Sequence, residues 1–106
     1  MVTINIAKDF SITPGARYKS DGPYSGEEFR EKYLEKYFAI DGNDEKITIV
    51  LDGTAGYGTS FLEEAFGGLA RKVGKEKCLA RLSFISLEEP LLIEEIKQYI
   101  NETTKN

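Results

Sequence analysis

The chain has 106 residues, of which 41% are hydrophobic and 30% are charged, a composition typical of one globular domain with a modest core. Its formal charge of −4 and the even spread of its lysines and arginines argue against nucleic acid as a partner. The absence of histidine excludes the usual zinc sites and histidine-based catalytic triads, and the single cysteine, Cys78, excludes an internal disulfide.

The chain also lacks the signals of membrane proteins and secreted proteins. Its longest uncharged apolar run is too short to cross a bilayer, and no charged and then apolar leader precedes Ile4. We therefore expect a soluble cytoplasmic protein that has no membrane partner, no metal and no cofactor.

The first predicted element is a strand at the N-terminus, where Val2, Ile4 and Ile6 alternate with less apolar residues. The segment 11–26 that follows contains Pro14-Gly15 and a second glycine and proline pair, which exclude a helix and predict a long ordered loop. Loops of this length in compact domains often carry function.

A first helix is predicted from Ser25 to about Phe38. Ser25 and Glu28 have the spacing of a capping box, and aromatic residues recur every four positions behind them. A turn at 41–44 then leads into a β-branched segment at 46–51. Its nearly continuous apolar character is typical of a central strand that is covered on both faces.

A second helix is predicted from near Ser60 to Gly74. Ser60 and Glu63 form another capping-box pair, and the apolar residues behind them make one stripe. Gly67 and Gly68 lie inside this helix, where each costs about 0.8–1 kcal/mol relative to alanine. Close packing against another element is the favoured explanation, and a smooth surface for a partner is the alternative.

A third strand is predicted at Leu79–Ile85, and Ser86 and Pro90 open a third helix that reaches about Asn101, after which the tail should fray. Strands and helices that alternate at these spacings predict parallel strands with right-handed crossovers. We therefore expect a single α/β domain, residues 1–106, with a small mixed sheet, parallel central strands and three main helices.

The glycine-rich turn between the second strand and the second helix is the predicted functional surface, because a helix that begins there presents unpaired N–H groups at the edge of the sheet. Segment 53–60 has the glycine spacing of a phosphate loop, but Thr59 stands where that loop needs lysine. Glu63 and Glu64 would also repel phosphates. A phosphate-binding or nucleotide-binding module, or an enzyme, that uses Asp52, Thr59 and Ser60 is therefore the alternative function.

Asp52 has two interpretations. Asp52-Gly-Thr54 is similar to the first motif of aspartate-nucleophile phosphatases, but Val50 stands where their nucleophile should be. Asp52 is then either part of a binding surface or a carboxylate that accepts hydrogen bonds from loop amides.

Four segments together resemble the small prokaryotic STAS-like domain family of unassigned function: residues 8–11, 14–17, 22–30 and 51–69. STAS domains proper are anti-sigma-factor antagonists and cytoplasmic tails of sulfate transporters. The antagonists bind a kinase-type ATPase and are switched by phosphorylation of a serine at the start of a helix. The resemblance implies a regulatory protein-binding module without catalysis of its own, with a histidine-kinase-type ATPase as the partner, since such ATPases are often encoded beside members of the family.

Carried onto this chain, the resemblance puts the phosphate acceptor at Ser60 or Thr59, although the spacing from the strand is about two residues shorter than in the antagonists. The alternative is that Ser60 only caps the helix. The residues expected to line the partner-binding surface are Arg17, Tyr18, Asp52, Thr54, Tyr57, Thr59 and Ser60.

Arg17 is expected to reach an acidic or phosphorylated group of the partner. A salt bridge to Asp52 or a solvated charge is the alternative. A homo-oligomer built on the exposed edge of the first strand is a further hypothesis.

Overall fold

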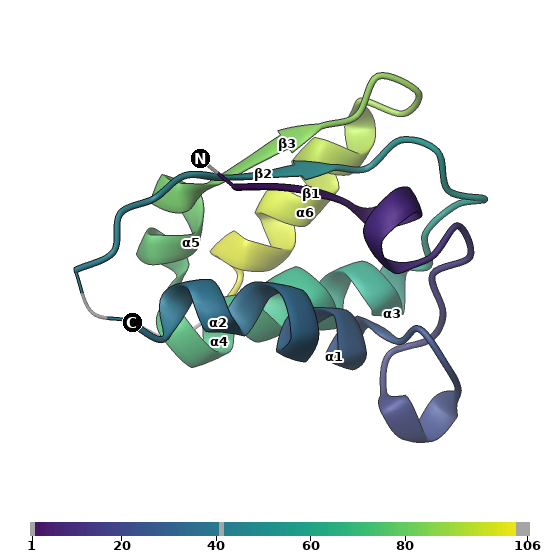
Figure 1. The fold of residues 1–106 in the computed structure, drawn as a ribbon, viewed down its shortest axis with the longest axis horizontal. Helices are drawn as coiled ribbons and strands as arrows, with labels where there is room; N and C mark the ends of the chain where they lie inside the picture. Colours follow the sequence, from purple (N-terminus) through teal and green to yellow (C-terminus); the bar gives the residue numbers. More distant parts are fainter. Residues whose placement is uncertain (1, 41, 104–106) are drawn as a thin grey trace.

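Three strands form one parallel sheet in the computed structural model, which describes residues 2–40 and 42–103 (Figure 1). The order is β1 (Val2–Asn5), β2 (Ile47–Val50) and β3 (Leu82–Ile85). Ile4 lies opposite Ile49, which in turn lies opposite Phe84. The expected α/β class, the parallel central strands and the central place of the second strand are confirmed. The expectation of a mixed sheet is wrong, because all pairs among the described strands are parallel.

The first predicted helix is confirmed, with Ser25 as its cap. It consists of α1 (Gly26–Phe29), a π-helical turn η3 (Arg30–Leu34) and α2 (Glu35–Phe38). The Ser25 hydroxyl accepts a hydrogen bond from the Glu28 amide at 3.0 Å, and the Glu28 carboxylate accepts one from the Tyr24 amide at 3.1 Å. The side chain of Glu28 therefore reaches one residue further back than in a standard capping box.

The second helix starts earlier than expected, and its predicted cap is wrong. It consists of α3 (Thr59–Leu62), a π-helical turn η4 (Glu63–Gly67) and α4 (Gly68–Val73). The N-cap is Gly58, whose extended backbone starts the helix and whose carbonyl accepts from the Leu62 amide at 3.2 Å. Ser60 already lies inside the first turn, so it cannot cap the helix.

A helix that the sequence did not predict, α5 (Lys75–Arg81), follows at Gly74 and shortens the third strand to Leu82–Ile85. Gly74 has a φ of 102°, which ends α4 and redirects the chain. The buried residues of α5 are Cys78 and Arg81, so no apolar stripe marks this helix.

The third predicted helix is confirmed as α6 (Leu91–Asn101), which buries Leu92, Ile96 and Ile100. The expected fraying after about residue 101 concerns a tail that lies mostly outside the described residues. None of the helices in the described ranges is long and apolar enough to cross a membrane. Two further short turns connect the elements: η1 (Ile6–Phe10), a π-helical turn, and η2 (Lys19–Asp21), a 3₁₀ turn.

The helices pack against one face of the sheet and leave the other face open (Figure 1). Ile47 and Ile49 are fully buried under the helices. Thr48 and Val50, which alternate with them along the strand, are only partly buried. The prediction that the central strand is covered on both faces is therefore wrong. Parallel sheets are usually covered on both sides, so an open face is unusual.

Candidate docking surface at the carboxyl ends of the strands

Three loops meet where the strands end, at residues 11–18, 52–58 and 86–90. The amide of Ala55 donates to the carbonyl of Ile12 at 2.7 Å, which joins the first loop to the second. Asp52 joins the second to the third, because its carboxylate accepts from the amides of Leu87 at 3.0 Å and Glu88 at 2.8 Å. One main-chain hydrogen bond and the Asp52 carboxylate therefore hold the three loops together at the carboxyl edge of the sheet.

Asp52 therefore takes the loop-holding role, which was one of its two interpretations. The contact is reciprocal, since the Glu88 carboxylate accepts from the Gly53 amide at 3.0 Å. Gly53 has a φ of 94°, a conformation that favours glycine and turns its amide toward Glu88. Glu88 was not singled out in the sequence, because no local pattern links two residues that lie 35 positions apart.

A small pocket of about 110 Å³ opens at this edge and brings together three of the predicted site residues, Asp52, Thr54 and Tyr57. The Thr54 hydroxyl accepts from the Gly56 amide at 3.3 Å, which closes the turn. The Tyr57 hydroxyl donates to the Leu51 carbonyl at 2.7 Å. The polar groups around the pocket are therefore engaged in holding the loop.

Burial raises the pKa of Tyr57 to about 12, and the negative charge of Asp52 acts in the same direction. Tyr57 is neutral at physiological pH and its proton is shared with a main-chain carbonyl, so it is poorly suited to proton transfer. The described residues contain no group of three side chains that could hold a metal ion.

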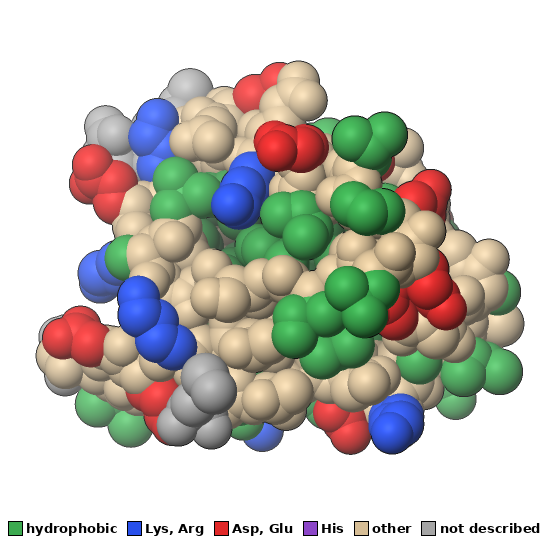
Figure 2. Space-filling model, turned by 90° about the horizontal axis from the view of Figure 1, so that it is seen from above, with side chains coloured by type: hydrophobic (Ala, Val, Ile, Leu, Met, Phe, Trp, Pro, Cys, Tyr) green, Lys and Arg blue, Asp and Glu red, His purple; other side chains and the backbone are tan. Residues whose placement is uncertain are grey.

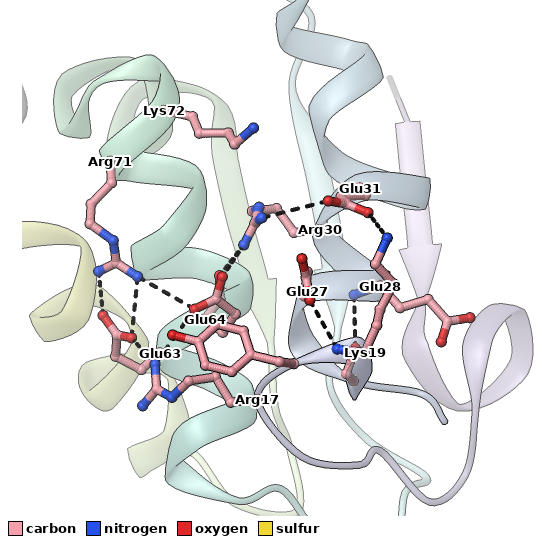
Figure 3. A network of polar contacts seen from close by, with 12 residues as sticks. Arg17, Lys19, Glu27, Glu28, Arg30, Glu31, Glu63, Glu64, Arg71 and Lys72 are labelled. Carbon is pink, nitrogen blue, oxygen red and sulfur yellow. Dashed lines mark hydrogen bonds and ion pairs between the residues drawn. The ribbon is translucent and has the colours of Figure 1, made fainter. Parts of the chain in front are cut away.

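Arg17 pairs with Glu63, which lies on the second helix, and not with Asp52 (Figure 3). The alternative of a salt bridge to Asp52 is therefore wrong. Glu63 also accepts from Arg71 at 2.5 Å, and its pKa is lowered chiefly by that hydrogen bond. Tyr18 is exposed and lies against the Arg17 guanidinium, with 5.9 Å between the ring centroid and the central carbon. Arg17 thus ties the loop 11–25 to the second helix.

Arg30 and Glu64 form a second, buried ion pair beside the first (Figure 3). The pair with Glu64 joins the first helix to the second, while Arg30 also binds Glu35 of its own helix at 2.8 Å. A Cβ atom on Gly68 would lie 2.7 Å from the Arg30 guanidinium, so the glycine makes room for that side chain. Close packing is the reason for Gly68, as favoured from the sequence.

Thr59 and Ser60 are exposed in the first turn of the second helix. The pKa of Tyr99 in α6 is raised by burial and by its hydrogen bond with Glu95, and a hydrogen bond with the Thr59 hydroxyl lowers it by less. Both hydroxyls are accessible to a macromolecule. The predicted residues therefore form three groups: Arg17 and Tyr18 beside Glu63, the pocket residues Asp52, Thr54 and Tyr57, and the exposed pair Thr59 and Ser60.

The comparisons with known proteins agree with this fold. The family model described as "STAS-like domain of unknown function (DUF4325)" matches residues 25–92, which run from the cap of the first helix to the start of α6. Comparison with curated proteins and with solved structures gave no match. Because the family model matches more than half of the chain, the protein belongs to this STAS-like family.

Proposed function

We propose that this protein is a non-catalytic regulatory module that binds a protein partner at the carboxyl ends of its strands and at the start of its second helix. One observation carries the proposal: the polar groups of the turn are engaged in holding its shape, while Thr59 and Ser60 stay exposed beside it. Membership of a STAS-like family supports the same function.

The proposed partner is a histidine-kinase-type ATPase, which the family resemblance implies. The test is isothermal titration calorimetry of the purified protein with the ATPase encoded near its gene, with and without ATP. A saturable complex is expected. No heat of binding under either condition would overturn the choice of partner.

Phosphorylation of Ser60 or Thr59 is the proposed switch. A phosphate on Ser60 would carry a charge of about −2 one helical turn from Glu63 and would compete with Glu63 for Arg17. We expect mass spectrometry after incubation with the ATPase and ATP to find phosphate in segment 59–60. We expect Ser60→Glu to weaken the complex while Ser60→Ala leaves it intact. An unmodified chain, or equal binding by both variants, would contradict the switch.

The alternative is a small phosphate-bearing ligand at the glycine-rich turn. The pocket of about 110 Å³ is smaller than ordinary ligand sites of about 300–1,000 Å³, so an inorganic phosphate fits better than a nucleotide. A thermal-shift screen of phosphate, nucleotides and phosphosugars tests it. A ligand at 100 times its dissociation constant would add about 2.7 kcal/mol of stability.

A cytoplasmic location and a prokaryotic origin are part of the proposal, as is an oligomer built on the β1 edge. Light scattering of the purified protein tests the oligomer directly. A mass equal to that of one chain at all concentrations would contradict it.

A further inference from the structure

Four large apolar side chains are exposed around the strand ends. The exposed fractions are 62% for Ile12, 41% for Ile85, 83% for Leu87 and 78% for Leu91. The loops of Ile12 and Leu87 are both joined to the turn 52–58, one by the Ala55 amide and the other by the Asp52 carboxylate. We call these four residues the apolar patch. Exposed leucines that are gathered in this way commonly mark an interaction site.

The apolar patch continues onto the open face of the sheet. Val50 lies opposite Ile85 in the register of β2 and β3, and both side chains point away from the helices. Figure 2 looks onto this face, where hydrophobic side chains form several patches. Ile85 thus belongs both to the apolar patch and to the uncovered face of the sheet.

Two segments beside the apolar patch, the turn after β2 and the segment from the end of β3 into α6, are acidic. Segments 51–62 and 85–96 hold five carboxylates and no lysine or arginine, although the whole chain has a charge of only −4. The five are Asp52, Glu88, Glu89, Glu94 and Glu95. In Figure 2, most of the visible lysine and arginine side chains lie toward the opposite end of the strands. Arg17, on the neighbouring loop, is already paired with Glu63.

We propose that this surface docks a basic amphipathic segment of the partner protein, with apolar side chains on the apolar patch and lysines or arginines against the carboxylates. The inference rests on the proposed function, because it states the chemistry of the protein segment that binds. Complementary charge steers such a segment, and buried leucines hold it. An anionic lipid surface would be repelled by the same carboxylates.

The test uses a synthetic amphipathic helical peptide of leucine and lysine and the ¹⁵N-labelled protein. We expect amide shifts in the NMR spectrum to concentrate at residues 12, 52–57 and 85–92, with affinity that falls as salt is added. The double variant Leu87→Ser/Leu91→Ser should bind at least about tenfold more weakly, because it removes two apolar side chains that the peptide would cover. Both positions are exposed, so the variant should keep its fold.

The matched control is Ile40→Ser. Ile40 is 68% exposed and lies after the first helix, in a segment that makes none of the bonds that join the strand-end loops, so this variant should bind as the unmodified protein does.

Glu88→Gln/Glu94→Gln should weaken binding and reduce its salt dependence. Equal binding by the leucine variant, shifts on another face, or equal affinity for a peptide with glutamates in place of lysines would each overturn the inference. Self-association that the leucine variant loses, without peptide binding, would assign the surface to a second copy and also overturn it.

Calorimetry with the ATPase separates this inference from the proposed function. Peptide binding at the apolar patch without an ATPase complex would refute the partner and support the surface. An ATPase complex of unchanged affinity in Leu87→Ser/Leu91→Ser would support the partner and refute the surface.

Discussion

Arg30 and Glu64 lie between the first and second helices and are both buried. The guanidinium donates to the Glu64 carboxylate, to the Glu64 carbonyl at 3.2 Å and to Glu35 at 2.8 Å, so the charge is well satisfied. From the sequence alone, charged residues on helices are expected to face solvent. In this protein a single pair of side chains, Arg30 and Glu64, bonds the first helix to the second.

Removing one member of this pair should destabilise the fold strongly. Glu64→Ala removes one of the two carboxylates that pair closely with the buried arginine and should lower the free energy of unfolding by about 3 kcal/mol, measured by urea denaturation. Replacing both residues, as in Arg30→Met/Glu64→Leu, should cost far less. The control Glu76→Ala changes an exposed residue of α5 and should stay within about 0.5 kcal/mol. A loss below about 1 kcal/mol for Glu64→Ala would show that the pair is unimportant.

Tyr57 should titrate late and should make stability depend on alkaline pH. Its pKa is about 12 in the folded protein and 10.0 in the reference state, so folding favours the neutral phenol. The stabilising contribution is complete below pH 10.0 and is lost as pH rises toward 12. Ultraviolet absorbance should show one tyrosine that ionises after the others, and Tyr57→Phe should remove that late step. At neutral pH the free energy of unfolding of Tyr57→Phe should be lower by about 0.5–1.5 kcal/mol, because the variant lacks the hydrogen bond to the Leu51 carbonyl.

At the scale of elements, the helical segment 59–73 begins without a side-chain cap. Gly58 has φ −77° and ψ 150°, which any residue can adopt, and a Cβ atom there would meet nothing within 4 Å. Gly26 differs, because a Cβ atom there would lie 2.5 Å from the carbonyl oxygen of Phe61. The two glycines therefore differ in their structural role. Gly26 allows the first and second helices to come into close contact, whereas no close contact requires a glycine at position 58.

Gly58→Ser should stabilise the protein by about 0.5–1 kcal/mol, because it adds a cap and reduces the freedom of the unfolded chain. Thermal unfolding measures the gain. Gly26→Ala is the contrasting variant and should destabilise the protein, since main-chain atoms cannot move aside cheaply. If Gly58→Ser were also destabilising, the structure of the turn would need revision.

At the scale of the whole molecule, one layer of helices and one sheet are held by a core on one side and by ion pairs around the loop 11–25. Arg17 joins this loop to Glu63, and Lys19 joins it to Glu31 at 2.5 Å (Figure 3). The open side of the sheet carries no comparable cover among the described residues. The core and these ion pairs thus lie on the side of the sheet that the helices cover.

Acid should destabilise this arrangement. Hydrogen bonds from Arg71 and Lys19 hold the pKa values of Glu63 and Glu31 below the reference value of 4.5. Depressed carboxylate pKa values contribute stability above pH 4.5 that is lost as pH falls through the folded pKa. Urea midpoints should therefore be constant between pH 7 and pH 5 and should decline below about pH 4.5. Glu63→Gln should flatten part of that decline, and an unchanged profile would contradict the role of the pair.

The sequence by itself determined the features that depend on neighbouring residues. Ser25 and Glu28 lie three positions apart, so their capping contact is visible in the printed chain. The order of strands and helices, the central place of β2 and the resemblance to a STAS-like family follow from patterns of the same kind. Two local features were not predicted correctly: α5, which has no apolar stripe to mark it, and the start of the second helix, where Gly58 rather than Ser60 is the N-cap.

Only the tertiary structure decided which distant residues meet. Arg17 and Glu63 are separated by 46 positions, and Asp52 and Glu88 by 36, so no local pattern could pair them. The open face of the sheet could not be predicted from the sequence either. The mostly apolar segment Ile47–Val50 is compatible with a strand that is covered on one face and with a strand that is covered on both. The physical reason is that strand and helix preferences act over a few residues, whereas the choice of an ion partner or an uncovered face depends on how the packed elements meet.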